Sequence, residues 1–312
     1  MKLSKRGMQI GLGLLWLLDG LLQFQPYMFT RSFATDILAG AGQGQPSLIN
    51  DSVVAMARFI EPHVLVWNTI FASIQVLIGA GLLFRRTVKP ALVISFFWVG
   101  VVWWFGEGFG QIFGGNSTLI SGAPGAALLY GLMGVLIWPN SKTSQGPISA
   151  QSVIGDFGGK MIWSSIWVVD GVLQLLPANY QGGALSTAFR SAGSGEPGLL
   201  AAVSHGIGNA VAGHNVQVAI VLGTLEIAIG LAVFLSKPNP ALFAGAILAF
   251  VMWIVGQDLG GILTGQGTDP NSGPLYVMLA LVLSQPRYLV VSSRVRGPEM
   301  KPGVYSRILP RL

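Results

Sequence analysis

The chain has no cysteine and few charged residues. Without thiols it can form neither disulfides, nor thiolate zinc sites, nor cysteine-ligated iron–sulfur clusters. Charged residues make up 10% of the 312 residues, whereas a soluble domain carries about 25%. Hydrophobic residues make up 52%, and the 43 glycines and 9 tryptophans are typical of packed membrane helices. The composition therefore predicts an all-α integral membrane protein.

Eight apolar runs are long enough to cross a bilayer as helices, since a crossing needs about 17–25 residues. The runs lie near residues 8–26, 64–84, 91–113, 122–138, 161–177, 215–235, 241–264 and 274–291. We therefore predict eight transmembrane helices. An even number of crossings leaves both ends of the chain on the same side of the bilayer.

The basic residues test this count, because cytoplasmic loops of membrane proteins are enriched in lysine and arginine. With the N-terminus inside, the outer loops hold three basic residues: Arg31, Arg58 and Arg190. The other 15 of the 18 then lie inside. We therefore place both termini in the cytoplasm and the chain in the inner (cytoplasmic) membrane. The net charge of +6 indicates this orientation and contact with anionic lipids, and no nucleic-acid partner is expected.

The two halves of the chain repeat each other at nearly constant spacing. The segment WLLDGLLQFQP (16–26) matches WVVDGVLQLLP (167–177) at a shift of 151 residues. Prolines, glycines and polar residues match over three predicted helices and a loop, at this shift or at 150. Because each half has an even number of spans, the repeat is parallel, about an axis along the membrane normal. We predict four-helix repeats at 1–145 and 146–291 and a basic cytoplasmic tail at 292–312.

The predicted outer loops, 27–63 and 178–214, are long and equal in length. The stretch 47–60 is predicted to form a short helix along the outer membrane surface. His63 and His214 stand at the ends of these loops, at the outer mouth of each half. They are candidate cofactor ligands, and one haem bound by both is a possible arrangement. The alternative is that both are interfacial residues with structural hydrogen bonds.

Polar side chains within predicted spans are candidate site residues, because they are costly in lipid and usually face the bundle interior or a cavity. Asp19 and Gln23 are four residues apart and share one helix face. Asp170 and Gln174 repeat this pair in the second half. We predict that the four residues bind a cofactor in outward-facing polar pockets, either one in each half or one merged at the axis between the halves. Their alternative role is to bridge helices through structural hydrogen bonds.

The third helix of each half carries the densest polar pattern. The segment WWFGEGFGQIFGG (103–115) places Glu107 four residues before Gln111, so a helix would put both on one face. The second copy, WIVGQDLGGILTG (253–265), has its carboxylate at Asp258. This is one position further along than Glu107, about 100° around a helix. The two pockets are therefore expected to differ in chemistry.

Glu107 and Asp258 are the predicted catalytic residues, because a carboxyl group in an apolar pocket can exchange protons with a ligand. Trp104 and Phe109 are predicted to bind the cofactor by flanking its ring. No metal ligands are assigned, although haem or a metal ion stays open as a cofactor.

A four-helix unit with an acidic, glycine-rich third helix resembles the DoxX/DoxD-like membrane proteins. The resemblance rests on the entry helix WLLDGLLQF (16–24) and on GEGFG (106–110), with GQDLG (256–260) as its second copy. It covers nearly the whole chain, and the tandem duplication departs from a single-unit member. DoxD-type proteins are associated with thiosulfate:quinone oxidoreductase. The resemblance therefore implies a subunit that passes electrons into the quinone pool, with quinone as the cofactor.

Three functions fit these observations. The first is a quinone-linked oxidoreductase subunit, whose electrons come from a bound cofactor or a partner protein. The second is a transporter for a cation or a small solute, with carboxylates and histidines gathered near the outer face. The third is a non-catalytic subunit of a respiratory or other membrane complex, held to its protein partners by closely packed helices.

Overall fold

The computed structural model describes residues 4–142 and 146–285, and the regular elements within these ranges are all helices. The all-α prediction is therefore confirmed for the described residues. The predicted tail (292–312) and the end of the eighth predicted span lie outside these ranges.

A helix occupies each of the eight predicted spans. They are α1 (Lys5–Leu22), α3 (Val64–Leu83), α4 (Val88–Val101), α5 (Ala126–Leu136), α6 (Gly155–Gln174), α9 (Asn215–Ala232), α10 (Asn239–Val255) and α11 (Gly273–Leu283). Within the described ranges, three stretches are both long and apolar enough to cross a membrane by length and composition: Ser47–Leu83, Val88–Gly106 and Asn215–Ala232. The chain is therefore consistent with a membrane protein.

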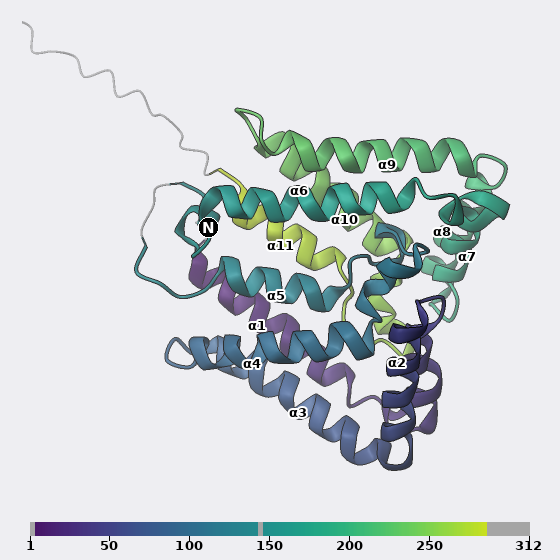
Figure 1. Cartoon of the computed structure of the whole chain (residues 1–312), viewed down its shortest axis with the longest axis horizontal. Coiled ribbons are helices and arrows are strands. Elements are labelled where there is room, and N and C mark those ends of the chain that lie inside the picture. Colours follow the sequence, from purple (N-terminus) through teal and green to yellow (C-terminus); the bar gives the residue numbers. More distant parts are fainter. Residues whose placement is uncertain (1–3, 143–145, 286–312) are drawn as a thin grey trace, which may run out of the picture.

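Three further helices come from the long loops. The stretch 47–60 forms α2 (Ser47–Ile60), as predicted, and the second loop forms α7 (Ala184–Ala192) and α8 (Gly198–Val211). Figure 1 shows α2, α7 and α8 at one end of the bundle, whereas α1 begins and α11 finishes at the opposite end. Short 3₁₀ and π turns complete the chain: η1 (Pro26–Phe29), η2 (Phe33–Leu38), η3 (Ala39–Gly42), η4 (Glu61–His63), η5 (Val102–Gly106), η6 (Phe109–Gly114), η7 (Leu119–Ser121), η8 (Ile148–Gln151), η9 (Pro177–Asn179), η10 (Gln181–Gly183), η11 (Asp258–Gly260) and η12 (Ile262–Thr264).

The third predicted span, 91–113, is wrong in its second part. Helix α4 ends at Val101 and a single π turn carries the chain to Gly106. The four residues from Gly108 to Gln111 then have φ between 51° and 64°. This left-handed backbone is costly except at glycine. Glu107 and Gln111 therefore do not share a helix face.

The seventh predicted span, 241–264, breaks at the same place. Helix α10 ends at Val255, and Asp258 and Leu259 have φ of 47° and 55°. The predicted rotation of about 100° around a helix does not apply, because Asp258 lies beyond the helix end. Apolar periodicity missed both breaks because the segments stay hydrophobic through them.

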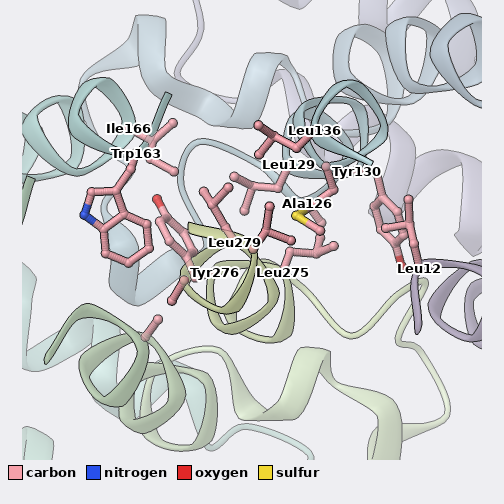
Figure 2. Packing of buried hydrophobic residues seen from close by; sticks show 14 of the residues in the cluster. Leu12, Ala126, Leu129, Tyr130, Leu136, Trp163, Ile166, Leu275, Tyr276 and Leu279 are labelled. Atoms are coloured by element: carbon pink, nitrogen blue, oxygen red, sulfur yellow. The ribbon is translucent and has the colours of Figure 1, made fainter. Parts of the chain in front are cut away.

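The helices pack in the same order in the two halves. Helix α1 packs on α3 as α6 packs on α9, and α4 packs on α5 as α10 packs on α11. Helices α5 and α11 meet between the halves. There Leu129 of α5 and Leu275 and Leu279 of α11 contribute to one hydrophobic core that runs through both halves (Figure 2). The division at residue 145 stays a prediction, since this core is continuous across it.

The bundle also leaves many large apolar side chains uncovered. Leu14, Leu77, Phe97 and Ile247 are more than half exposed, on four different long helices. Exposure of many large apolar side chains is consistent with helices that face lipid.

Gly110 should be intolerant of a side chain. Its φ is 64°, and a Cβ there would lie 2.1 Å from the carbonyl oxygen of Pro124. We expect Gly110→Ala to lower the free energy of unfolding by about 2 kcal/mol or more, from the left-handed backbone and the clash. Thermal unfolding in detergent measures the effect. Gly100→Ala is the control, because a Cβ within α4 at Gly100 meets nothing within 4 Å and should be neutral or stabilising. Equal unfolding temperatures for the two variants would contradict the expectation.

Candidate functional site

The first half contains a cavity of about 370 Å³ between α1, α2, α3, α4 and α5. We call it the aromatic pocket, because rings from these helices and from η2 and η5 form much of its wall. The rings belong to Trp16, Phe33, Phe59, Trp67, Phe71, Trp98, Phe105 and Tyr130. Residues of α2 line it, so it lies toward the end of the bundle that carries α2, α7 and α8.

Part of the lining of the aromatic pocket is polar. Three carboxyl groups, those of Asp19, Glu107 and Asp269, line it together with Gln23 and Gln75. Among the residues that line this pocket there is no lysine, arginine or histidine. Several oxygen atoms of the lining make no hydrogen bond of normal length: Asp19 Oδ1, Gln23 Oε1, Gln75 Oε1, Glu107 Oε2 and the Tyr130 hydroxyl. Among them, Asp19 and Tyr130 lie close enough to interact with each other. A ligand with hydrogen-bond donors or a positive charge would satisfy them.

Glu107 is held in place through one of its two carboxyl oxygens. The backbone N–H of Ala127 donates to Glu107 Oε1 at 2.9 Å. This bond caps the N-terminus of α5, where unpaired N–H groups favour a carboxyl group. Gly125 leaves room for the second oxygen, since a Cβ there would lie 2.2 Å from Oε2. Glu107 therefore makes a structural bond with one oxygen, and its other oxygen is buried beside Gly125 without a hydrogen bond of normal length.

The second half repeats this framework with an amide. Gln257 Oε1 accepts from the N–H of Gly273 at 3.1 Å, at the N-terminus of α11. Trp253 Nε1 donates to the carbonyl oxygen of Pro270 at 2.6 Å, as Trp103 Nε1 donates to that of Pro124 at 2.9 Å in the first half. Gln257, and not Asp258, is therefore the counterpart of Glu107.

The aromatic wall does not recur in the second half. Six ring residues of the pocket are Phe33, Phe59, Trp67, Phe71, Trp98 and Phe105. At the repeat shifts of 151 and 150, their counterparts are Ala184, Ala210, Val218, Leu222, Leu248 and Val255. Each ring is replaced by an aliphatic side chain, so the ring-binding character belongs to the first half alone.

The structure brings three predicted site residues together in the aromatic pocket: Asp19, Gln23 and Glu107. Trp104 and Phe109 do not line it. Trp104 Nε1 donates to Ser52 Oγ at 2.9 Å, and the Phe109 ring packs on Trp103 and Trp104 with centroids 4.9 and 5.3 Å apart. Both side chains stabilise the turn after α4 through these contacts and do not flank the cavity.

The predicted residues of the second half lie apart from this pocket. Asp170 accepts a hydrogen bond from the Tyr276 hydroxyl, and the side chain of Gln174 is buried without a partner. Asp258 Oδ1 accepts a hydrogen bond at 3.4 Å from Oγ of Ser204, which lies on α8. The Asp170–Tyr276 pair is a helix-to-helix bond, which is the structural alternative for Asp170.

His63 and His214 are both exposed. They directly precede α3 and α9, and Figure 1 shows that these helices begin at opposite edges of the bundle. One haem bound by both residues stays a prediction. Within the described ranges, no group of three or more histidine, aspartate or glutamate side chains is arranged to hold a metal ion.

Two residues of the site were not found from the sequence. Tyr130 corresponds to Tyr276 at a shift of 146 in the last helix of each half, so a comparison of these helices would have found the pair. Asp269 corresponds to Ala123 at the same shift. It lies in a loop of the other half, and nothing in its local sequence places it beside Glu107.

The two tyrosines provide a matched prediction on stability. The Tyr276 hydroxyl donates to Asp170, whereas the Tyr130 hydroxyl lies close enough to Asp19 to interact with it but makes no hydrogen bond of normal length. Tyr276→Phe should lower the free energy of unfolding by about 1–3 kcal/mol, because it leaves buried Asp170 without its donor. Tyr130→Phe should change it by much less. Thermal unfolding of both variants in one detergent tests this, and a larger loss for Tyr130→Phe would contradict it.

Comparison of the chain with protein-family models, with curated protein sequences and with solved structures gives no match.

Proposed function

We propose that all eight long helices cross the bilayer and that both ends of the chain lie in the cytoplasm. The charge distribution along the sequence supports this arrangement. The position of α2, α7 and α8 at the end opposite to the start of α1 supports it as well. In this orientation the aromatic pocket lies toward the outer face.

The absence of cysteine allows a direct topology test. Single cysteines at exposed positions, Thr35→Cys and Ser194→Cys, should react with a membrane-impermeant maleimide added to intact cells. Ser141→Cys and Ser236→Cys should react only after the cells are opened. The cysteine-free parent chain is the control. Labelling of Ser141→Cys or Ser236→Cys in intact cells would contradict the eight-span topology.

We further propose that the protein is a quinone-linked membrane subunit that binds a quinol head group in the aromatic pocket. The observation that carries this proposal is an aromatic cavity whose lining includes carboxyl oxygens without hydrogen bonds of normal length. A cavity of about 370 Å³ is within the range of roughly 300–1,000 Å³ found for ligand pockets. The resemblance to DoxX/DoxD-like proteins agrees with this ligand class.

The two parts of a quinol match the two parts of the pocket. The planar ring packs between aromatic side chains, which favour stacked and edge contacts. Each hydroxyl group donates a hydrogen bond, and Asp19 Oδ1 and Glu107 Oε2 are acceptors that make no hydrogen bond of normal length. Asp19 and Glu107 are then the proton-exchanging groups. The electrons pass to or from a partner protein or a bound cofactor.

An isoprenoid tail needs a way out of the pocket toward lipid. Phe59, Ile70 and Val101 line the pocket and are also 60%, 41% and 36% exposed. They lie on α2, α3 and α4, so this side of the bundle connects the cavity to its apolar surface. A tail leaving between these helices would stay in an apolar environment.

Binding of a short-tailed hydroquinone to purified protein in nanodiscs tests the proposal, with tryptophan fluorescence as the readout. Glu107→Gln should raise the Kd about tenfold, because it replaces an acidic group at the free oxygen while keeping the bond to Ala127. Gln257 shows that an amide can make the corresponding bond. The double variant Phe71→Leu/Trp98→Leu, which copies the second half, should also raise the Kd about tenfold.

Asp258→Asn is the matched control, because Asp258 is an acidic residue outside the aromatic pocket. It should bind the hydroquinone as the parent chain does. Equal affinity for all four proteins would overturn the proposal and would favour a structural role in a membrane complex.

A lipophilic cation is the second candidate ligand, as expected for a cation transporter. The lining carries three carboxyl groups and no basic side chain, and aromatic rings attract organic cations. Tetraphenylphosphonium is the probe for this class. Binding of tetraphenylphosphonium without binding of hydroquinone would favour the transporter.

A further inference from the structure

Each half of the protein is closed by a loop from the other half. Gln25 Nε2 donates to the carbonyl oxygen of Gly267 at 3.3 Å, and the next residues, Thr268 and Asp269, line the aromatic pocket. In the other direction, Gln257 Nε2 donates to the carbonyl oxygen of Leu119 at 2.7 Å. The loop before α11 therefore enters the first half, and the loop before α5 enters the second.

The exchanged loops are equivalent in position but not in chemistry. Asp269 occupies the place that Ala123 has in the first repeat. Ala123 offers the second half a backbone carbonyl, 3.4 Å from the Tyr276 hydroxyl, whereas Asp269 brings the first half a carboxyl group. The first half therefore contains a carboxyl group that its own sequence does not supply.

A second cavity, of about 430 Å³, adjoins the aromatic pocket. We call it the polar vestibule, because many of its lining groups are hydrophilic: Asp36, Gln111, Ser117, Ser121 and Asn271. Five residues line both cavities: Ile37, Gly106, Glu107, Ala126 and Asp269. Glu107 and Asp269 are the two proton-carrying residues in this shared wall.

Asp269 is fixed at this wall by its own loop. Its Oδ1 accepts from the N–H of Asn271 at 2.7 Å, and its Oδ2 accepts from Thr268 Oγ1 at 2.9 Å. The carboxyl group lies close enough to Asp19 and to Glu107 for their charges to interact. No basic side chain is among the described residues that line either cavity.

The mouth of the vestibule is exposed to solvent. Asp36 is exposed there, and Thr35 Oγ1 donates to its Oδ1 at 2.8 Å. This hydrogen bond holds the pKa of Asp36 below its usual value. The mouth therefore carries a charged carboxylate that can exchange protons with water.

We propose that Asp269 of the second half completes the site of the first half, and that Glu107 and Asp269 together form the proton route from the aromatic pocket to the polar vestibule. This route deepens the proposed function. Only the identity of the ligand that supplies the proton rests on that proposed function. A ligand hydroxyl gives its proton to Glu107 Oε2, and Glu107 gives one to Asp269, which releases one to water in the vestibule. Each transfer breaks one O–H bond and forms another, and no electron moves in these steps.

Infrared spectroscopy of the ligand-free protein in nanodiscs tests the route. The C=O band of the Glu107 carboxyl group, identified by its loss in Glu107→Gln, should shift when the sample is moved from H₂O to D₂O. Asp269→Asn should slow this exchange at least tenfold, because the intermediate proton carrier is lost. Asp269→Glu should restore it, and Asp258→Asn should leave it unchanged.

A second variant tests the route without altering its carboxyl groups. Gly40 lines the polar vestibule, and a Cβ there would meet nothing within 4 Å. Gly40→Phe should fill part of the vestibule and slow the exchange of the Glu107 band. An exchange rate unchanged in both Asp269→Asn and Gly40→Phe would overturn the proposal. Absence of a Glu107-dependent C=O band at every pH at which the protein stays folded would overturn it too.

This experiment separates the route from the proposed ligand. Slowed exchange in Asp269→Asn, together with no hydroquinone binding by the parent chain, would support the route and reject the quinol. Hydroquinone binding with unchanged exchange would support the quinol and reject the route.

Discussion

The N-terminus of the last helix in each half needs a hydrogen-bond acceptor, and much of the site depends on how that need is met. The first N–H groups of a helix have no partner within it. An unpaired N–H group inside the bundle is costly, and a side-chain oxygen removes that cost. In the first half Glu107 supplies an oxygen to Ala127, and in the second half Gln257 supplies one to Gly273. Helices α4 and α10 end at Val101 and Val255, well before the ends of the predicted spans. The glycines of GEGFG and GQDLG permit the left-handed backbone that follows.

The two solutions differ in what is left over after the cap is made. Gln257 uses its amide completely, because Nε2 also donates to Leu119 and to Ser272. Glu107 uses one oxygen and keeps the other free. The exchange of a carboxamide for a carboxyl group thus leaves one oxygen of Glu107 without a hydrogen bond of normal length, whereas every polar atom of the Gln257 amide is used. The aromatic side chains are a second difference between the halves. They line the pocket that contains Glu107, and most of their counterparts in the second half are aliphatic.

Much of the fold was predictable from the sequence, since apolar length located a helix at each of the eight predicted spans. The shift of 151 residues matched α1 with α6 and α3 with α9, and α1 packs on α3 as α6 packs on α9. Periodicity could not locate the ends of α4 and α10, because left-handed residues such as Phe109 and Leu259 are as apolar as helical ones. The site was only partly predictable for a related reason. Asp19, Gln23 and Glu107 stand out as polar residues in apolar helices, whereas Trp104 and Phe109 looked like a ring site but pack on each other.

The unpredicted part of the site comes from tertiary structure. Asp269 belongs to the second half by sequence and to the first half by position, because the loops before α5 and α11 cross between the halves. Because of this crossing, each half depends on the other for part of its structure. A single four-helix unit would leave the α5 side of its core uncovered, and its pocket would lack the wall that Thr268 and Asp269 form. Once two units close each other in this way, a change in the loop of one unit alters the site of its neighbour. The halves could then diverge, with one keeping the aromatic pocket and the other supplying part of its wall.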